Sequence, residues 1–84
     1  MTKYPKIIRK AAVLERYPVG TTTLYKQINQ GIFPPNVAMG SRLVGWIESE
    51  VDAVIAAIAR GINEPSLKQL VAELVAKRNE LSGT

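Results

Sequence analysis

The 84-residue sequence contains neither cysteine nor histidine, and aromatic residues make up only 6% of it. Without cysteine and histidine, a protein cannot form disulfide bonds, thiolate zinc sites, or the Ser-His and Cys-His pairs of nucleophilic catalysis. The few carboxylates stand at expected helix starts and on an exposed face, with no plausible partner base. We therefore expect no enzymatic activity, no bound metal and no cofactor.

Long apolar segments are also missing. The longest apolar run falls far short of the roughly 20 residues that a membrane span needs, and the N-terminus lacks the apolar core of a signal peptide. We therefore expect a cytoplasmic protein with no membrane partner. At this length, the chain is expected to form one small folded unit with a single core of modest stability.

Positive charge is concentrated in the first part of the chain. The net charge is +4, but residues 1–46 contain seven Lys or Arg against one acidic residue, a balance of +6. Residues 47–84 contain four against six, a balance of −2. A basic end joined to a mildly acidic end is typical of a domain that meets a polyanion with one side only.

Two short helices are predicted near the N-terminus. The first covers 9–16 and is broken by Pro18 and Gly20, because proline cannot continue a helix and glycine permits a turn. The second covers 21–30 and stops at Gly31. Two short helices separated by about four residues have the form of a helix-turn-helix.

A β-hairpin and a third helix are predicted next. Apolar residues between 37 and 46 flank a short turn at 39–42, and Trp46 is large enough to pack the hairpin on the helices. Residues 4–8 are expected to form a short strand or an extended arm. The third helix covers 48–60, with a core stripe of Val51, Val54, Ile55 and Ile58.

A fourth, amphipathic helix is signalled by Pro65 and Ser66. Its apolar residues share one stripe: Leu67, Leu70, Val71, Leu74, Val75 and Leu81. This stripe either folds back on the chain's own core or pairs with the same helix of a second copy. We take pairing as the working hypothesis, which makes the six residues an oligomerisation surface and predicts a homodimer with a fixed half-site spacing.

The second helix carries the residues expected to read DNA. With Leu24 and Ile28 facing the first helix, Thr22, Lys26 and Asn29 share a polar face. Such side chains hydrogen-bond base edges and hold phosphates. A solvated helix face or an ordinary hairpin turn would explain each feature singly, but their combination favours DNA binding. The complete expected surface is Thr21, Thr22, Thr23, Tyr25, Lys26, Asn29, Ser41, Arg42, Arg9 and Lys10.

Five motifs that occur in order carry a resemblance to a known family. The stretches GTTTLYKQINQGIFP and VAMGSRLVGWIESEVDAVI resemble the AlpA family of phage and prophage transcriptional regulators, within the excisionase and MerR-like winged-helix group. The resemblance covers about 7–60. Gly20 stands where the family often has a capping serine, and Thr21 where it often has an arginine, so the DNA sequence read or the affinity is expected to differ. The matching positions are 22–25, 31–34, 40–42, 45–46 and 48–51.

We therefore expect a mainly α fold with a small β-hairpin, which is a winged helix-turn-helix at 1–62 followed by a C-terminal amphipathic helix at 63–84. The resemblance implies a sequence-specific transcriptional regulator of prophage integration or excision genes, associated with the nucleoid, with double-stranded DNA and a recombinase or the transcription machinery as partners. Two alternatives stay open: an excisionase-like factor that bends DNA, and a protein-interaction adaptor that has lost DNA binding, because fold alone does not fix function.

Overall fold

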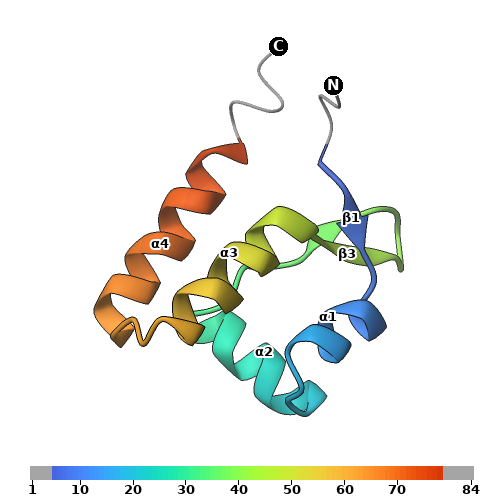
Figure 1. The fold of residues 1–84 in the computed structure, drawn as a ribbon. Coiled ribbons are helices and arrows are strands. Elements are labelled where there is room, and N and C mark those ends of the chain that lie inside the picture. Colours follow the sequence, from blue (N-terminus) through green and yellow to red (C-terminus); the bar gives the residue numbers. More distant parts are fainter. Residues whose placement is uncertain (1–4, 79–84) are drawn as a thin grey trace.

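The computed structural model describes residues 5–78, which form a mainly helical fold with one small antiparallel sheet (Figure 1). The three strands lie in the order β1-β3-β2, so the last strand in sequence is central. The elements follow the order β1 (Ile7–Ile8), α1 (Lys10–Arg16), α2 (Thr21–Gln30), β2 (Val37–Ala38), β3 (Val44–Ile47), α3 (Glu48–Ala59) and α4 (Glu64–Ala76).

The two N-terminal helices form as the sequence predicts. α1 ends at Arg16, and four residues connect it to α2. Gly20 is the N-cap of α2, with extended backbone angles and no side-chain cap. At the other end, Gly31 adopts a left-handed conformation with φ of 81°, and its N–H donates to the carbonyl of Ile28 at 3.1 Å. Glycine suits this position because a Cβ makes positive φ unfavourable.

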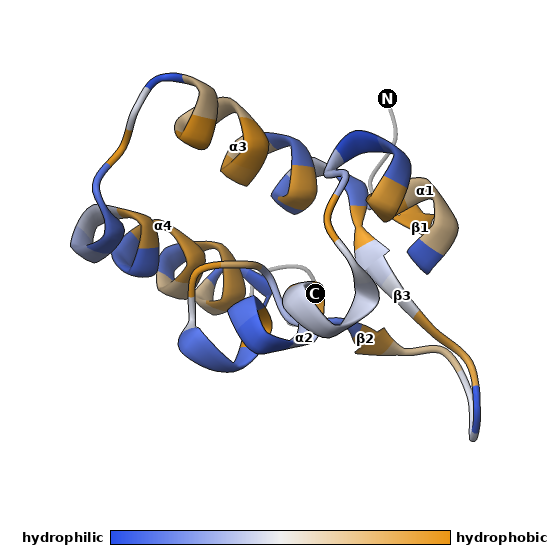
Figure 2. Ribbon diagram, turned by 90° about the horizontal axis from the view of Figure 1, so that it is seen from below, coloured by the Kyte–Doolittle hydropathy of each residue, from blue (hydrophilic) through white to orange (hydrophobic). Residues whose placement is uncertain are grey.

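The sheet joins the N-terminal segment to the hairpin. Ile7 pairs with Ile47 and Ile8 with Trp46, so the segment predicted as a strand or an arm is a strand. The hairpin between β2 and β3 is confirmed, but its loop spans 39–43, longer than the predicted turn at 39–42. A hydrogen bond of 2.7 Å from the Met39 N–H to the Leu43 carbonyl closes it. Figure 2 shows this loop protruding from the body of the molecule.

Aromatic residues fill the centre of the core. Trp46 and Phe33 are fully buried, and the ring of Phe33 stacks on Tyr17 with centroids 5.0 Å apart. The packing role predicted for Trp46 is confirmed. The predicted stripe of α3 is wrong at its last position, because Ile58 is 37% exposed whereas Ala57 is fully buried. The buried arc of α3 is rotated towards Ala57 because the helix packs on both the sheet and α4.

The fourth helix lies alongside α3 and contributes to the same core (Figure 1). Asn63 caps its start by accepting a hydrogen bond of 2.9 Å from the Ser66 N–H. Leu67 and Val71 are buried, 7% and 5% exposed, in one cluster with Trp46. The fold-back alternative therefore describes the arrangement of this helix within the chain.

The remaining residues of the apolar stripe occupy its edge. Leu70, Leu74 and Val75 are half-buried and pack against the core cluster. Leu81 lies outside the described residues. Self-association through α4 stays a prediction, and it would have to use the half-buried edge or release the helix from the core.

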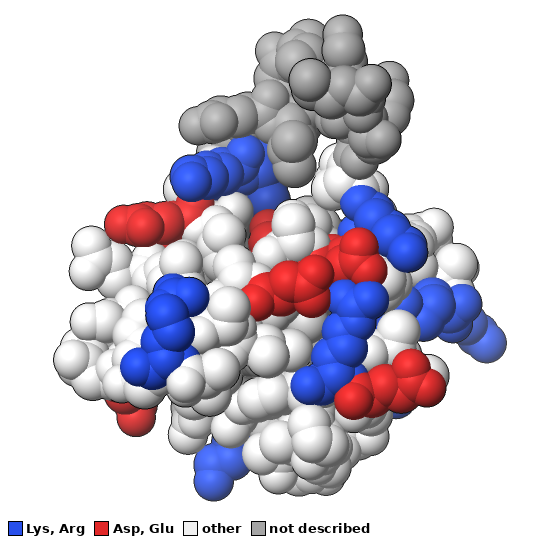
Figure 3. All heavy atoms as spheres, in the orientation of Figure 1, with Lys and Arg blue, Asp and Glu red and all other residues white. Residues whose placement is uncertain are grey.

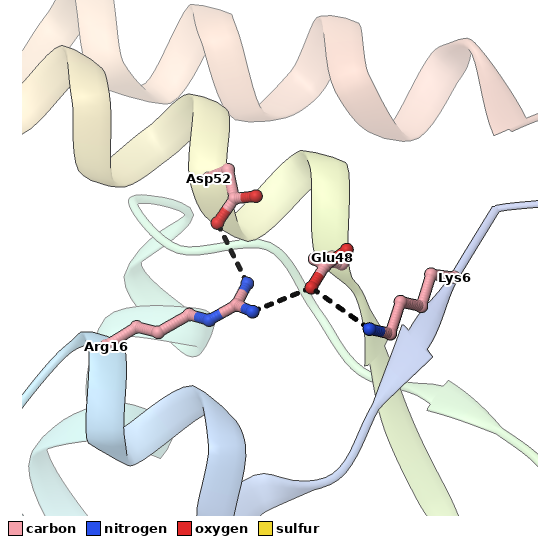
Figure 4. A network of polar contacts seen from close by, with 4 residues as sticks. All are labelled: Lys6, Arg16, Glu48 and Asp52. Atoms are coloured by element: carbon pink, nitrogen blue, oxygen red, sulfur yellow. Dashed lines mark hydrogen bonds and ion pairs between the residues drawn. The ribbon is translucent and has the colours of Figure 1, made fainter.

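The carboxylates of α3 form ion pairs that the sequence pattern did not predict. Glu50 was expected at an exposed helix start, but it is 4% exposed and pairs with Arg78. Arg16 of α1 donates to Glu48 at 2.7 Å and to Asp52 at 3.0 Å. Figure 4 shows these contacts together with the Lys6 ammonium, 3.8 Å from Glu48. The network ties α1 and the residue before β1 to α3.

Within residues 5–78, every helix is too short or too polar to cross a lipid bilayer.

Candidate nucleic-acid interface

The exposed face of α2 forms the first part of the candidate site. Leu24 is fully buried and Ile28 half-buried, which turns the polar residues of the helix outward. This face borders a hollow of about 670 Å³ lined by Thr21, Thr22, Tyr25, Lys26, Asn29 and Gln30. Five of these six residues are predicted site residues. Gln30 was missed, although it lies four residues after Lys26, on the same side of a helix.

A second hollow brings the start of α1 to the hairpin. It has a volume of about 500 Å³ and is lined by Arg9, Lys10, Ala11, Tyr25, Arg42 and Val44. From the sequence, Arg9, Lys10 and Arg42 were predicted as separate DNA contacts. In the structure all three line the same hollow. Ser41 and Thr23 are exposed but line neither hollow. Ala11 and Val44 were not predicted, because small or apolar residues carry no signal for DNA contact.

Tyr25 joins the two hollows, since its side chain belongs to the lining of both. The residue is half-buried, and its ring lies 6.4 Å from the ring of Trp46 in a tilted arrangement. The indole of Trp46 is itself fixed, because its Nε1 donates to the Pro34 carbonyl at 3.1 Å. Packing on the core therefore holds Tyr25 between the α2 face and the hairpin, and the two hollows form one continuous surface, which we call the α2–hairpin surface.

The cations of the α2–hairpin surface are free of ion pairs. Among residues 5–78, no carboxylate lies within salt-bridge distance of Arg9, Lys10, Lys26 or Arg42. All four side chains are exposed. Their charge is therefore available to an external anion.

Outside this surface, the ion pairs of residues 5–78 involve Lys6, Arg16, Lys68 and Arg78, whereas the exposed Arg60 and Lys77 have none. The hydrogen bond from Arg16 lowers the pKa of Glu48 and raises that of Arg16 itself. On the face shown in Figure 3, some lysines and arginines of the described residues lie beside carboxylates, and others lie among uncharged side chains. The +6 balance of the first part of the sequence is therefore expressed mainly at the α2–hairpin surface, because Lys6 and Arg16 are paired with acidic residues of α3.

Figure 2 shows α2 and the protruding loop from the side on which α2 is nearest to the viewer. The ribbon of α2 is mostly coloured hydrophilic or neutral, and the loop carries a hydrophilic stretch near its tip. The polar residues Lys26 and Asn29 of α2 and Arg42 of the loop are exposed. Hydroxyl, amide, ammonium and guanidinium groups are the side-chain donors that contact phosphates and base edges.

Within residues 5–78, no group of three or more acidic side chains is placed to hold a metal ion.

A mainly helical fold with a small antiparallel sheet and an unpaired cationic surface is compatible with the winged-helix class of nucleic-acid-binding proteins. The chain belongs to the family described as prophage CP4-57 regulatory protein (AlpA), whose model matches residues 6–57, more than half of the sequence. The resemblance noted from the sequence is thereby confirmed.

One relative is an uncharacterized protein, ORF88, of Enterobacteria phage P4. It is 35% identical over 51 residues, which cover 61% of this chain and 58% of the relative. The match thus spans less than two thirds of the phage protein. No solved structure matches the chain. The family is one of regulatory proteins, and its match ends before α4 begins.

Proposed function

We propose that this protein is a sequence-specific regulator that binds double-stranded DNA and controls integration or excision genes of a prophage or a related mobile element, without enzymatic activity of its own. The observation that carries the proposal is the α2–hairpin surface. Its four unpaired cations flank the polar side chains of one helix face. Membership of a prophage regulatory family supports the same function, and the protein would act in the cytoplasm on the chromosome.

In this proposal, α2 is the recognition helix. Thr22, Lys26 and Asn29 border the same hollow, and we assign them to base edges in the major groove, where threonine, lysine and asparagine each have suitable partners. The first N–H groups of α2 have no side-chain cap, so they can donate to a phosphate. The helix thereby combines base reading with an anchor on the DNA backbone.

Arg42, Arg9 and Lys10 are assigned to the DNA backbone. They converge on the second hollow, next to Tyr25, so a strand that follows the α2 face would pass between the start of α1 and the protruding loop. Each phosphate neutralised by such a cation changes the log-log salt dependence of binding by about −0.9. These residues are expected to give affinity rather than sequence preference.

Fluorescence anisotropy tests the proposal with two duplexes, one from the protein's own gene neighbourhood and one with the same bases scrambled, from low to physiological salt. A specific regulator prefers its site by about a thousandfold or more. The double variant Thr22→Ala with Lys26→Ala should lose this preference while remaining folded. Lys77→Ala is the matched charge control for the lysine, because Lys77 is exposed just beyond α4 and lines neither hollow.

Three other results would count against the proposal. Equal, salt-sensitive binding to both duplexes would favour an architectural factor, and a circular-permutation gel-shift assay would then detect the bend. Absence of binding to either duplex would favour a protein-interaction adaptor. Full sequence preference in the folded double variant would show that α2 is not the recognition helix.

A further inference from the structure

The connector between α2 and β2 contains two adjacent prolines whose carbonyls accept hydrogen bonds from side chains of other elements. Proline has no N–H, so Pro34 and Pro35 cannot donate the backbone hydrogen bonds that fix most turns. Their carbonyls are each bound by a side chain from a distant element. Pro34 accepts from Trp46 Nε1 at 3.1 Å, and Pro35 accepts from Arg78 Nη2 at 2.9 Å.

Arg78 is itself held in place by a buried carboxylate. Its Nε donates to Oε2 of Glu50 at 2.8 Å, and its Nη2 donates to Oε1 at 2.5 Å. The two side chains are 20% and 6% exposed. A bidentate pair of this kind fixes the orientation of the guanidinium plane as well as its position. Arg78 therefore presents a fixed donor to Pro35, two residues beyond the end of α4.

The connector joins α2 to the hairpin, whose β3 is also held by its pairing with β1. At its beginning, the Ile32 N–H donates to the carbonyl of Gln27 in the last turn of α2, at 3.1 Å. At its end, Val37 opens β2 and pairs with Gly45 of β3. The hydrogen bond to Pro35 lies between these two anchors. A shift of Pro35 would move β2 and its loop while α2 stays on the core.

We propose that Arg78 is a positioning residue for the α2–hairpin surface, which it does not line. By fixing the Pro35 carbonyl from the end of α4, it holds the hairpin with Arg42 at a set position relative to α2. The inference rests on the proposed function, because that surface matters only if it binds DNA. The family match ends at residue 57, so this contact comes from a part of the chain that lies outside it.

The experiment compares Glu50→Gln with the double variant Glu50→Gln and Arg78→Met. Removing the arginine alone would leave a buried, unpaired carboxylate and could unfold the chain, so the single variant neutralises Glu50 first. In Glu50→Gln the bidentate pair is lost, but the amide oxygen can still accept from Arg78, so the guanidinium keeps a donor for Pro35. Amide shifts of residues 36–44 that match the wild type verify that this hydrogen bond remains. In the double variant it is lost, although methionine keeps much of the side-chain bulk. The pair therefore differs in the contact to be tested.

Three quantities are measured at a temperature at which circular dichroism shows both variants folded. The backbone amide chemical shifts of residues 36–44 and the hydrogen exchange of the Trp46 indole do not require DNA. The third quantity is the affinity for the preferred duplex. Relative to Glu50→Gln, the double variant should show shifted amides, faster indole exchange and affinity reduced by about 2- to 30-fold.

Unchanged amide shifts in the double variant would overturn the positioning role, whatever the DNA result. Shifted amides with unchanged affinity would overturn its importance for the interface. If the wild-type chain shows no preference for any duplex, the proposed function fails, and the amide and indole measurements alone decide whether Arg78 positions the hairpin. The failure of one proposal is thereby distinguished from the failure of the other.

Discussion

Replacing Leu67 with alanine tests whether the apolar residues of α4 pack in the chain's own core or pair with α4 of a second copy of the chain. The leucine is 7% exposed in the folded chain, so nearly all the methyl and methylene groups removed by the substitution leave the core. Such truncations cost about 2–5 kcal/mol, because the loss of burial is joined by the cost of a cavity. A domain of 84 residues has a total stability of roughly 4–13 kcal/mol.

The substitution should therefore remove a large fraction of the free energy of unfolding. For a domain of this size, each kcal/mol shifts the unfolding midpoint by roughly 4–8 °C, so Leu67→Ala should lower the midpoint by about 10 °C or more. Thermal unfolding followed by circular dichroism measures this shift. Lys68→Ala is the matched control, because the Lys68 side chain next to Leu67 is 52% exposed and, among residues 5–78, has one ion pair, with Glu64 at 3.6 Å. Exposed pairs of this kind contribute about 0.5 kcal/mol or less.

Two results would refute the reasoning. If Leu67→Ala and Lys68→Ala unfold within about 0.5 kcal/mol of each other, α4 is not part of the core. If the wild-type midpoint rises with protein concentration and Leu67→Ala abolishes that rise, the helix stabilises an assembly of two copies instead. A chain whose stability comes from its own core gives a midpoint that does not depend on concentration.

Two further predictions concern the sheet and the ion-pair network. Gly45→Ala should destabilise the fold by about 1–3 kcal/mol in urea denaturation, because a Cβ there would lie 2.5 Å from Cγ2 of Ile7 and 3.0 Å from the carbonyl oxygen of Ile8. An unchanged midpoint would show that β1 can move away freely. The hydrogen bond from Arg16 lowers the pKa of Glu48 below the ordinary value of 4.5, so this contact stabilises the fold above pH 4.5 and is lost as the pH falls through the lowered pKa. An NMR titration of the carboxyl group should show its pKa rising towards 4.5 in Arg16→Ala, and an unchanged pKa would contradict this origin of the shift.

Local patterns were enough to predict most of the elements. The break at Pro18 and Gly20 and the stop at Gly31 delimit two short helices, because proline and glycine act on the backbone of their own neighbourhood. The structure has α1 and α2 at nearly those bounds. The choice of residues on the exposed side of α2 followed from the helical period alone, and five of the predicted residues line one hollow.

Features that depend on distant partners were not predictable in this way. The burial of Glu50 depends on Arg78, 28 residues away in sequence, and a charged residue at a helix start gives no local sign of such a partner. The exposure of Ile58 has a similar origin, because the packing of α3 on the sheet and α4 decides which arc of the helix is buried. The hydrophobic periodicity and the bounds of α3 therefore do not predict which side of the helix is buried.

By itself, the sequence determined the helices, the hairpin, the family and the one-sided distribution of charge, since all of these depend on composition, short-range spacing and linear motifs. Only the tertiary structure decided that Arg9, Lys10 and Arg42 share one hollow with Tyr25, that the apolar stripe of α4 faces the chain's own core, and that Pro35 is held by Arg78. Contacts between residues tens of positions apart depend on the way the whole chain packs, because many alternative partners satisfy the same local pattern.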